Sequence, residues 1–302
     1  MTISSVSSTS ISLELATFRS QALGSLFNAN AANDRDALWA AVSRQSGLGD
    51  ANSAESDPLS MPAAAGGIKG LSPSGRNLAL FNPESAYKMM SVIKGNDASY
   101  KAQFSELSQM KAAVAQMQEA GQTLGGIDAS ASNQSIAARL QNFVARYNDW
   151  VERFGPDMQA GGVLADTQAA QVSRHELEQS VENVFNGAKD GVHGLADLGV
   201  TIDPRSGLAS LDGARLDALL NGNRSGAVDT LQEFSANFTK SASLLTSDGN
   251  IVPNRLDNLG KVINYFAEHQ ADLQSEFGTG DAARPKGLLA QALAAYNQRY
   301  GV

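Results

Sequence analysis

A regularly spaced run of large apolar residues limits what the middle of this chain can fold into. The intervals alternate between four and three residues, and the members are Ile136, Leu140, Phe143, Tyr147, Trp150 and Phe154. This spacing places every member on one face of an α-helix, whereas a strand would send alternate residues to opposite faces. We therefore predict an amphipathic helix that ends at Gly155 and Pro156.

The same spacing recurs along much of the sequence. Upstream it covers Tyr100–Met117, a stretch that includes Phe104 and Leu107. Thr167 and Asp212 are expected to cap two of the helices that follow. The alternating intervals are those of a coiled-coil seam, but they span fewer than three heptads, so an intramolecular bundle is the favoured interpretation. The further predicted helices cover residues 167–187, 212–222, 231–245, 256–273 and 289–300.

The period changes from helical to alternating near residues 199–212. Val200 and Ile202 alternate with polar residues, turn-forming residues occupy 204–207, and 208–211 supplies a returning apolar segment. This pattern predicts a short β-hairpin. The predicted fold class is therefore mainly α: an elongated helical bundle with one small β-hairpin.

Composition along the chain predicts three regions. Residues 1–46 begin with a Ser/Thr-rich segment that is expected to be disordered, followed by short helices. Residues 47–82 are rich in Gly, Ser, Pro and Ala and have little apolar periodicity, which is typical of a linker. Residues 83–302 are predicted to form a helical domain.

The overall charge argues against nucleic acid as a partner. The formal net charge is -8, whereas binding to phosphates requires a basic face. No cysteine is present, which excludes disulfides, thiolate metal sites and a cysteine nucleophile. The first ten residues contain no Lys or Arg, so we expect no general secretory signal there. No apolar stretch approaches the roughly 20 residues needed to span a bilayer, so no membrane span is predicted.

The search for catalytic chemistry identifies no candidate site. The three histidines are His175, His193 and His269, and none lies in a recognised catalytic or metal-binding motif. No phosphate-binding glycine loop follows a predicted strand. We therefore predict a protein that is not an enzyme, with no cofactor, no bound metal and no small-molecule substrate.

The apolar stripes supply the candidate residues for packing or for an interface. Core packing is the default role for such positions, although Tyr, Trp and Phe are also enriched where proteins meet. If they are core residues, replacing Phe143 or Trp150 with Ala would destabilise the fold by roughly 3–5 kcal/mol. If they lie at an interface, the same change would leave the chain folded but unassembled. The candidates are Phe143, Tyr147, Trp150, Phe104 and Leu107.

Four short motifs follow one another in a fixed order, at Phe143–Trp150, Gly162–Asp166, Leu195–Asp203 and Gly207–Asp212. They resemble FV-x-x-YN, G-x-L-x-x-D, L-x-x-(I/L)-G-(I/V)-x-x-D and G-x-L-x-L-D, the patterns of the C-terminal region of the flagellar hook-associated protein 2 family, the bacterial filament cap. The second segment is one residue shorter than its pattern, and the fourth has Ala209 where the pattern has Leu. Tyr100–Leu107 also resembles the closing Y-x-x-QF-x-x-L segment of that family, displaced toward the N-terminus.

The resemblance implies an all-α core with a small β element, export through the flagellar type III apparatus, and action as an oligomeric scaffold. The implied partners are other flagellar axial proteins or further copies of the chain, and the implied location is extracellular. Residues 284–302 lack the final motif of the family, and no strand-rich outer domain is evident, which indicates a reduced or divergent relative. A cytoplasmic helical adaptor or chaperone-like binding module is the alternative interpretation.

Overall fold

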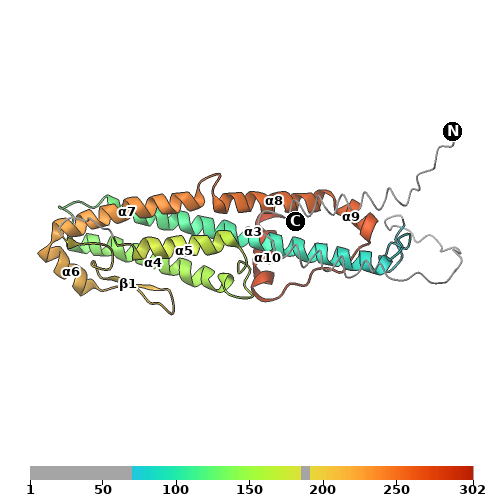
Figure 1. Cartoon of the computed structure of the whole chain (residues 1–302), viewed down its shortest axis with the longest axis horizontal. Helices are drawn as coiled ribbons and strands as arrows, with labels where there is room; N and C mark the ends of the chain where they lie inside the picture. The colour runs from blue at the N-terminus through green and yellow to red at the C-terminus, as the bar shows by residue number, and fades with distance from the viewer. Residues whose placement is uncertain (1–69, 185–190, 302) are drawn as a thin grey trace, which may run out of the picture. The chain divides into compact units, whose positions relative to one another are not determined.

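The computed structural model describes residues 70–184 and 191–301 (Figure 1). The expectations for residues 1–69, and the helix stop expected at 186–187, lie outside the described residues. The described chain divides into two compact units. The smaller unit contains residues 70–94 and 264–283, and the larger contains 95–184, 191–263 and 284–301.

Helices make up most of the described chain, and the mainly α fold with one small hairpin is confirmed for that part. Two short strands, β1 and β2, pair between α5 and α6. The elements are α3 (Pro83–Gly125), α4 (Asn133–Met158), α5 (Gln168–Glu182), β1 (Val200–Ile202), β2 (Ala209–Leu211), α6 (Gly213–Gly222), α7 (Arg224–Thr246), α8 (Ile251–Glu268), α9 (Gln270–Phe277) and α10 (Gly287–Tyr300).

The hairpin forms where the alternating pattern predicted it. The strands are antiparallel, with Val200 opposite Leu211. The connecting turn is fixed by Asp203, whose Oδ1 accepts hydrogen bonds from the backbone N–H groups of the two residues that follow Pro204, at 2.9 and 2.7 Å. These N–H groups lower the pKa of Asp203, because they stabilise its charged form. Asp212 then caps α6 as predicted, accepting from two backbone N–H groups at 3.0 Å each.

The core of the larger unit is built on the predicted apolar face of α4. The ring of Phe143 meets Phe234 and Phe238 of α7 edge to face, with centroids 5.1 and 4.9 Å apart. Gly121 of α3 lies against the same cluster, and a Cβ at that position would lie 2.8 Å from the Phe238 ring. Three helices therefore meet at one aromatic centre, and the absence of a side chain on Gly121 allows α3 to approach it. In Figure 1, α4, α5 and α7 run side by side, with α6 and the hairpin at one end of this group.

The predicted end of α4 at Gly155 and Pro156 is wrong by a few residues, because the helix continues to Met158. Arg153 and Asp157 form an ion pair at 3.0 Å across this turn, and the side chains of Asp157 and Met158 are buried. Packing and charge pairing in the last turn therefore outweigh the hydrogen bond that proline cannot donate.

Three further predictions about helix ends are corrected. The single stripe over 256–273 forms two helices, because the backbone at His269 departs from helical geometry, with φ -104° and ψ 12°. Thr167 does precede α5, but its side chain makes no capping hydrogen bond. Its carbonyl instead accepts from the N–H groups of Ala170 and Gln171, at 3.0 and 3.1 Å. The helix ends at Glu182, earlier than the pattern indicated.

Candidate interaction site

The candidate packing or interface residues lie within the larger unit. Four of them are buried by the chain itself, namely Leu107, Phe143, Tyr147 and Trp150. Phe104 is partly buried, and its ring makes edge contacts with Tyr296 and Tyr300 of α10, at centroid distances of 6.0 and 5.5 Å. The side chains of the four buried residues are thus covered without any partner.

A surface groove of about 300 Å³ lies between α3 and α4, next to this core. Its α3 side consists of two small residues between two glutamines, and its α4 side carries two aromatic rings and three charged groups. One arginine of α10 completes the lining. The lining residues are Gln109, Ala112, Ala113, Gln116, Arg146, Asp149, Trp150, Arg153, Phe154 and Arg299.

Arg153 is anchored at the edge of this groove by two buried carboxylates. Its guanidinium donates to Glu106 at 2.6 Å, to Asp157 at 3.0 Å and to the side-chain amide oxygen Oε1 of Gln109 at 3.2 Å. Both carboxylate side chains are about 95% or more buried, at 5% and 3% exposed, whereas Arg153 is 46% exposed. The arginine therefore compensates two charges that α3 and α4 remove from water.

Burial raises the pKa of Glu106, and the neighbouring Asp157 carboxylate adds to the increase. The positive charge of Arg153 acts in the opposite direction. Removal from water is the largest of these effects, so the folded chain holds a proton on Glu106 more tightly than an exposed glutamate would.

Two polar atoms on the buried face of α4 lack hydrogen-bond partners. They are the hydroxyl of Tyr147 and the indole N–H of Trp150, and no described residue pairs with either. Burial is also the main reason why the pKa of Tyr147 lies well above its ordinary value. A buried donor without an acceptor costs about 1–3 kcal/mol of folding free energy. Each of these two groups therefore offsets part of the stability that burial of its own ring provides.

Asn148 joins two of the motifs that carry the family resemblance. Its side-chain amide donates to the carbonyl of Ala209 at 2.8 Å, and its carbonyl accepts from the N–H of the same residue at 2.7 Å. The side chain thus pairs with strand β2 as another strand would. This contact attaches the hairpin to α4, and it connects the Phe143–Trp150 motif to the Gly207–Asp212 motif.

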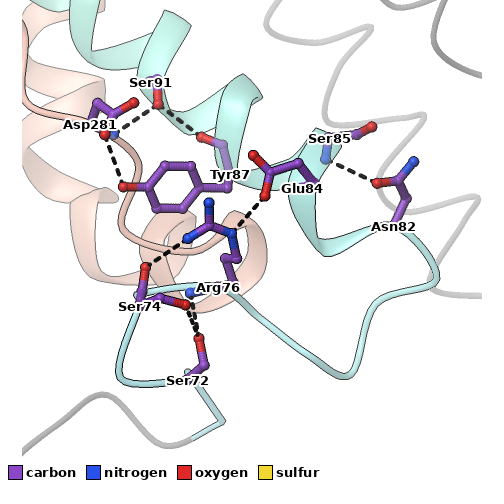
Figure 2. Close-up of polar contacts among 9 residues, drawn as sticks. All are labelled: Ser72, Ser74, Arg76, Asn82, Glu84, Ser85, Tyr87, Ser91 and Asp281. Atoms are coloured by element: carbon purple, nitrogen blue, oxygen red, sulfur yellow. Dashed lines mark hydrogen bonds and ion pairs between the residues drawn. The ribbon is translucent and has the colours of Figure 1, made fainter.

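A second cluster of polar contacts lies in the smaller unit, around the start of α3 (Figure 2). Arg76 forms an ion pair with Glu84 at 2.6 Å, and its guanidinium lies over the ring of Tyr87, 4.4 Å from the centroid. The Tyr87 hydroxyl donates to Asp281 at 3.0 Å. The backbone N–H of Asp281 in turn donates to Ser91 at 2.8 Å.

This cluster joins the beginning of α3 to the loop before α10 within the smaller unit. The hydrogen bond to Asp281 raises the pKa of Tyr87, because it favours the protonated phenol. The groups are half-buried or exposed, so water competes for them, and such contacts add little to the free energy of folding while they fix the positions of the two backbone segments. We therefore assign the cluster a positioning role and no chemistry.

The histidines do not form a catalytic or metal-binding group in the part of the chain that the structure describes. His269 stacks on Tyr265 with ring centroids 4.2 Å apart, and the backbone N–H of His193 donates to Asp197 at 2.9 Å. Over residues 70–184 and 191–301, no three His, Asp or Glu side chains gather as a metal site would require. Within the same ranges, no helix has both the length and the apolarity to cross a membrane.

Sequence reasoning missed Arg153, Glu106, Asp157 and Asn148. The pair Arg153 and Asp157 could have been found, since opposite charges four residues apart share a helix face. Glu106 and Arg153 are 47 positions apart, and Asn148 and Ala209 are 61 apart, so no periodicity within one helix links either pair. Those contacts depend on how the elements pack.

Comparison with known proteins gives one limited sequence match. No protein-family model matches the chain. The flagellar hook-associated protein 2 of Helicobacter pylori (strain J99) is 31% identical over 111 residues, which is 34% of this chain and 16% of the relative. The chain thus resembles this protein, as the four motifs predicted, while the match spans about a sixth of the relative's length.

A solved structure, that of the D1-D2-D3 domains of the flagellar cap protein FliD from Escherichia coli, also resembles part of this chain. The aligned part covers 42% of this chain and 37% of that one, with 18% sequence identity and a TM-score of 0.38. This TM-score is too low to define a shared fold, so the sequence match and the motifs carry the comparison.

Proposed function

We propose that this chain is a structural, non-enzymatic component of the bacterial flagellum, similar to hook-associated and filament-cap proteins. The observation that carries the proposal is the match to hook-associated protein 2, over 111 residues at 31% identity. The contact of Asn148 with Ala209 supports it, because it makes two of the resembling motifs parts of one packed element. The proposed location is extracellular, reached by the flagellar export route.

We test the location by fractionating cells that produce an epitope-tagged chain from its own locus. One strain has a working flagellar exporter, and the matched control lacks it. We expect the chain in sheared filaments or culture medium of the first strain only, with a cytosolic marker absent from those fractions. Confinement to the cytosol of both strains would overturn the proposal and favour the adaptor or chaperone-like alternative.

The proposed mode of action is oligomeric helical packing with flagellar axial proteins or further copies of the chain. Large apolar side chains exposed in the smaller unit support this view, since Phe81 is fully exposed and Leu78 is 57% exposed. Light scattering of purified chain measures the oligomer directly. We expect the double variant Leu78→Ser/Phe81→Ser to shift the mass toward monomer. The control Leu244→Ser, at an equally exposed position of α7, should leave the mass unchanged. An unchanged mass in both variants would remove Leu78 and Phe81 from the proposed interface.

A further inference from the structure

The groove between α3 and α4 has a shape that could accommodate a third helix. Its α3 side is built from positions 109, 112, 113 and 116, and its α4 side from 146, 149, 150, 153 and 154. Both sets follow the i, i+3, i+4, i+7 pattern by which one helix presents a continuous face to another. Each face extends over about two helical turns, or roughly 10 Å.

The floor of the groove is small and apolar. Ala112 is exposed and Ala113 is half-buried, so no long side chain fills the space between the helices. Small residues at such positions allow helix axes to approach within about 8–10 Å. An occupant with short apolar side chains would therefore find a matching surface.

The rim of the groove carries three arginines, Arg146, Arg153 and Arg299, and one acidic residue, Asp149. Arg153 is already bonded to two carboxylates. Arg146 has only an exposed partner, Asp149, at 3.7 Å. Arg299 forms no ion pair with the described residues, and its guanidinium lies 5.8 Å from the ring centroid of its neighbour Tyr300. Arg146 and Arg299 are therefore able to receive acidic groups from outside.

Trp150 lines the groove beside Phe154 and is 2% exposed. A helix seated in the groove would therefore change the surroundings of the indole ring, which makes Trp150 a reporter of binding.

We propose that this groove binds an acidic amphipathic helix of a partner protein. Short apolar side chains of that helix pack on Ala112 and Ala113, and its Glu or Asp residues pair with Arg146 and Arg299. The apolar floor favours a helix over a small anion, and the two arginines that are not bonded to buried carboxylates, Arg146 and Arg299, favour an acidic helix over a basic one. This inference is independent of the proposed flagellar role, since it depends on the groove alone.

The test uses the full-length chain with Trp39→Phe, which leaves Trp150 as the only tryptophan. The probe is a capped synthetic peptide of about 18 residues, long enough to form a helix, with Ala and Leu on one face and Glu beside it. A matched peptide carries Lys in place of Glu. We expect a saturable change in Trp150 emission with the acidic peptide, at least about tenfold tighter than with the basic one, and weakened by added salt.

Charge reversal identifies the residues responsible. The double variant Arg146→Glu/Arg299→Glu should lose the acidic peptide and prefer the basic one. Arg215→Glu is the matched control, because Arg215 is an exposed arginine of α6 outside the groove, and it should bind as the parent does. Circular dichroism verifies that each variant is folded. If the double variant is unfolded, the proposal is decided by the parent chain alone. The two measurements are then its preference for the acidic over the basic peptide and the salt dependence of that binding.

Three results would overturn the proposal. The first is no emission change with either peptide up to about 1 mM, which would mean binding weaker than about 4 kcal/mol. The second is equal affinity for both peptides, or affinity for the acidic peptide that survives charge reversal. The third is an emission change that follows the concentration of the chain without peptide, which would make a second copy the occupant.

Discussion

Two tyrosines show how differently the two parts of the molecule are held together. Tyr147, in the larger unit, is fully buried on α4, and its hydroxyl has no hydrogen-bond partner among the described residues. Tyr87, in the smaller unit, is half-exposed, and its hydroxyl bonds to Asp281 while its ring receives Arg76. Tyr147 contributes to stability through apolar contact, despite its unsatisfied hydroxyl. Tyr87 contributes mainly through polar contacts, because it is less buried.

The comparison teaches where the stability of each region comes from. Burial of an aromatic side chain contributes several kcal/mol, enough to outweigh a lost hydrogen bond. Exposed hydrogen bonds and ion pairs contribute far less, because water competes for the same groups. Substitutions on the buried face of α4 should therefore move stability strongly, and those around Tyr87 weakly.

The largest effect is expected for Phe143→Ala, at the contact of α4 with α7. This change removes a fully buried ring that touches Phe234 and Phe238, and it leaves a cavity. We expect a loss of about 3–5 kcal/mol in the free energy of unfolding, measured by urea titration followed by circular dichroism. The control is Val92→Ala, at an exposed apolar residue of the smaller unit, for which the change should stay within about 0.5 kcal/mol. Similar losses in both variants would contradict the distinction between the regions.

The next effect is expected for Asn148→Ala, which removes both hydrogen bonds to Ala209. The freed backbone groups of β2 would lose their partner, so we expect a loss of about 2 kcal/mol. Hydrogen exchange should become faster at Ala209 in particular, because its N–H loses its acceptor. Asn142→Ala is the matched control, an exposed asparagine on the same helix, and it should leave both measurements nearly unchanged. Exchange at Ala209 that stays as slow as in the parent would contradict the role given to Asn148.

Glu106→Gln gives a smaller effect that depends on pH. The pKa of Glu106 is raised in the folded chain, so its contribution to stability is fully present below the pKa of an exposed glutamate. That contribution is lost as the pH rises through the higher folded pKa. Gln carries no charge, so the variant should gain stability relative to the parent as the pH rises above about 4.5.

Urea unfolding at several pH values measures this difference. Glu119→Gln, on an exposed part of the same helix, changes the net charge equally and serves as the control. A variant that became less stable than the parent as the pH increased would show that the ion pair with Arg153 outweighs burial.

The smallest effects are expected when each tyrosine loses its hydroxyl. Tyr147→Phe removes a buried, unpaired polar atom and should stabilise the chain by up to about 1 kcal/mol. Tyr87→Phe removes the bond to Asp281 and should lower the unfolding midpoint slightly. Differential scanning calorimetry of the two variants tests the opposite signs. A loss of stability in Tyr147→Phe would show that its hydroxyl is satisfied in solution.

The sequence predicted the helices, the hairpin and the cap at Asp212, because these depend on neighbours within a few residues. The sequence did not predict the helix boundaries at Pro156 and His269 correctly, because tertiary packing there overrides the local conformational preference of the chain. At Pro156 the buried Asp157 and Met158 extend the helix, and at His269 the backbone bends between two helices although the apolar stripe continues. The domain division remains a prediction, as does the role of the aromatic residues as an interface.

The sequence by itself determined the mainly α fold class, the position of the hairpin and the resemblance to hook-associated protein 2. Periodicity and short motifs are local properties of the chain. They can therefore be recognised in the sequence without knowing which helices and strands pack together. Only the tertiary structure decided that Asn148 binds β2, that Arg153 compensates two buried carboxylates, and that an arginine-rimmed groove lies between α3 and α4. Each of these contacts joins residues from different elements, and helix packing brings those residues together.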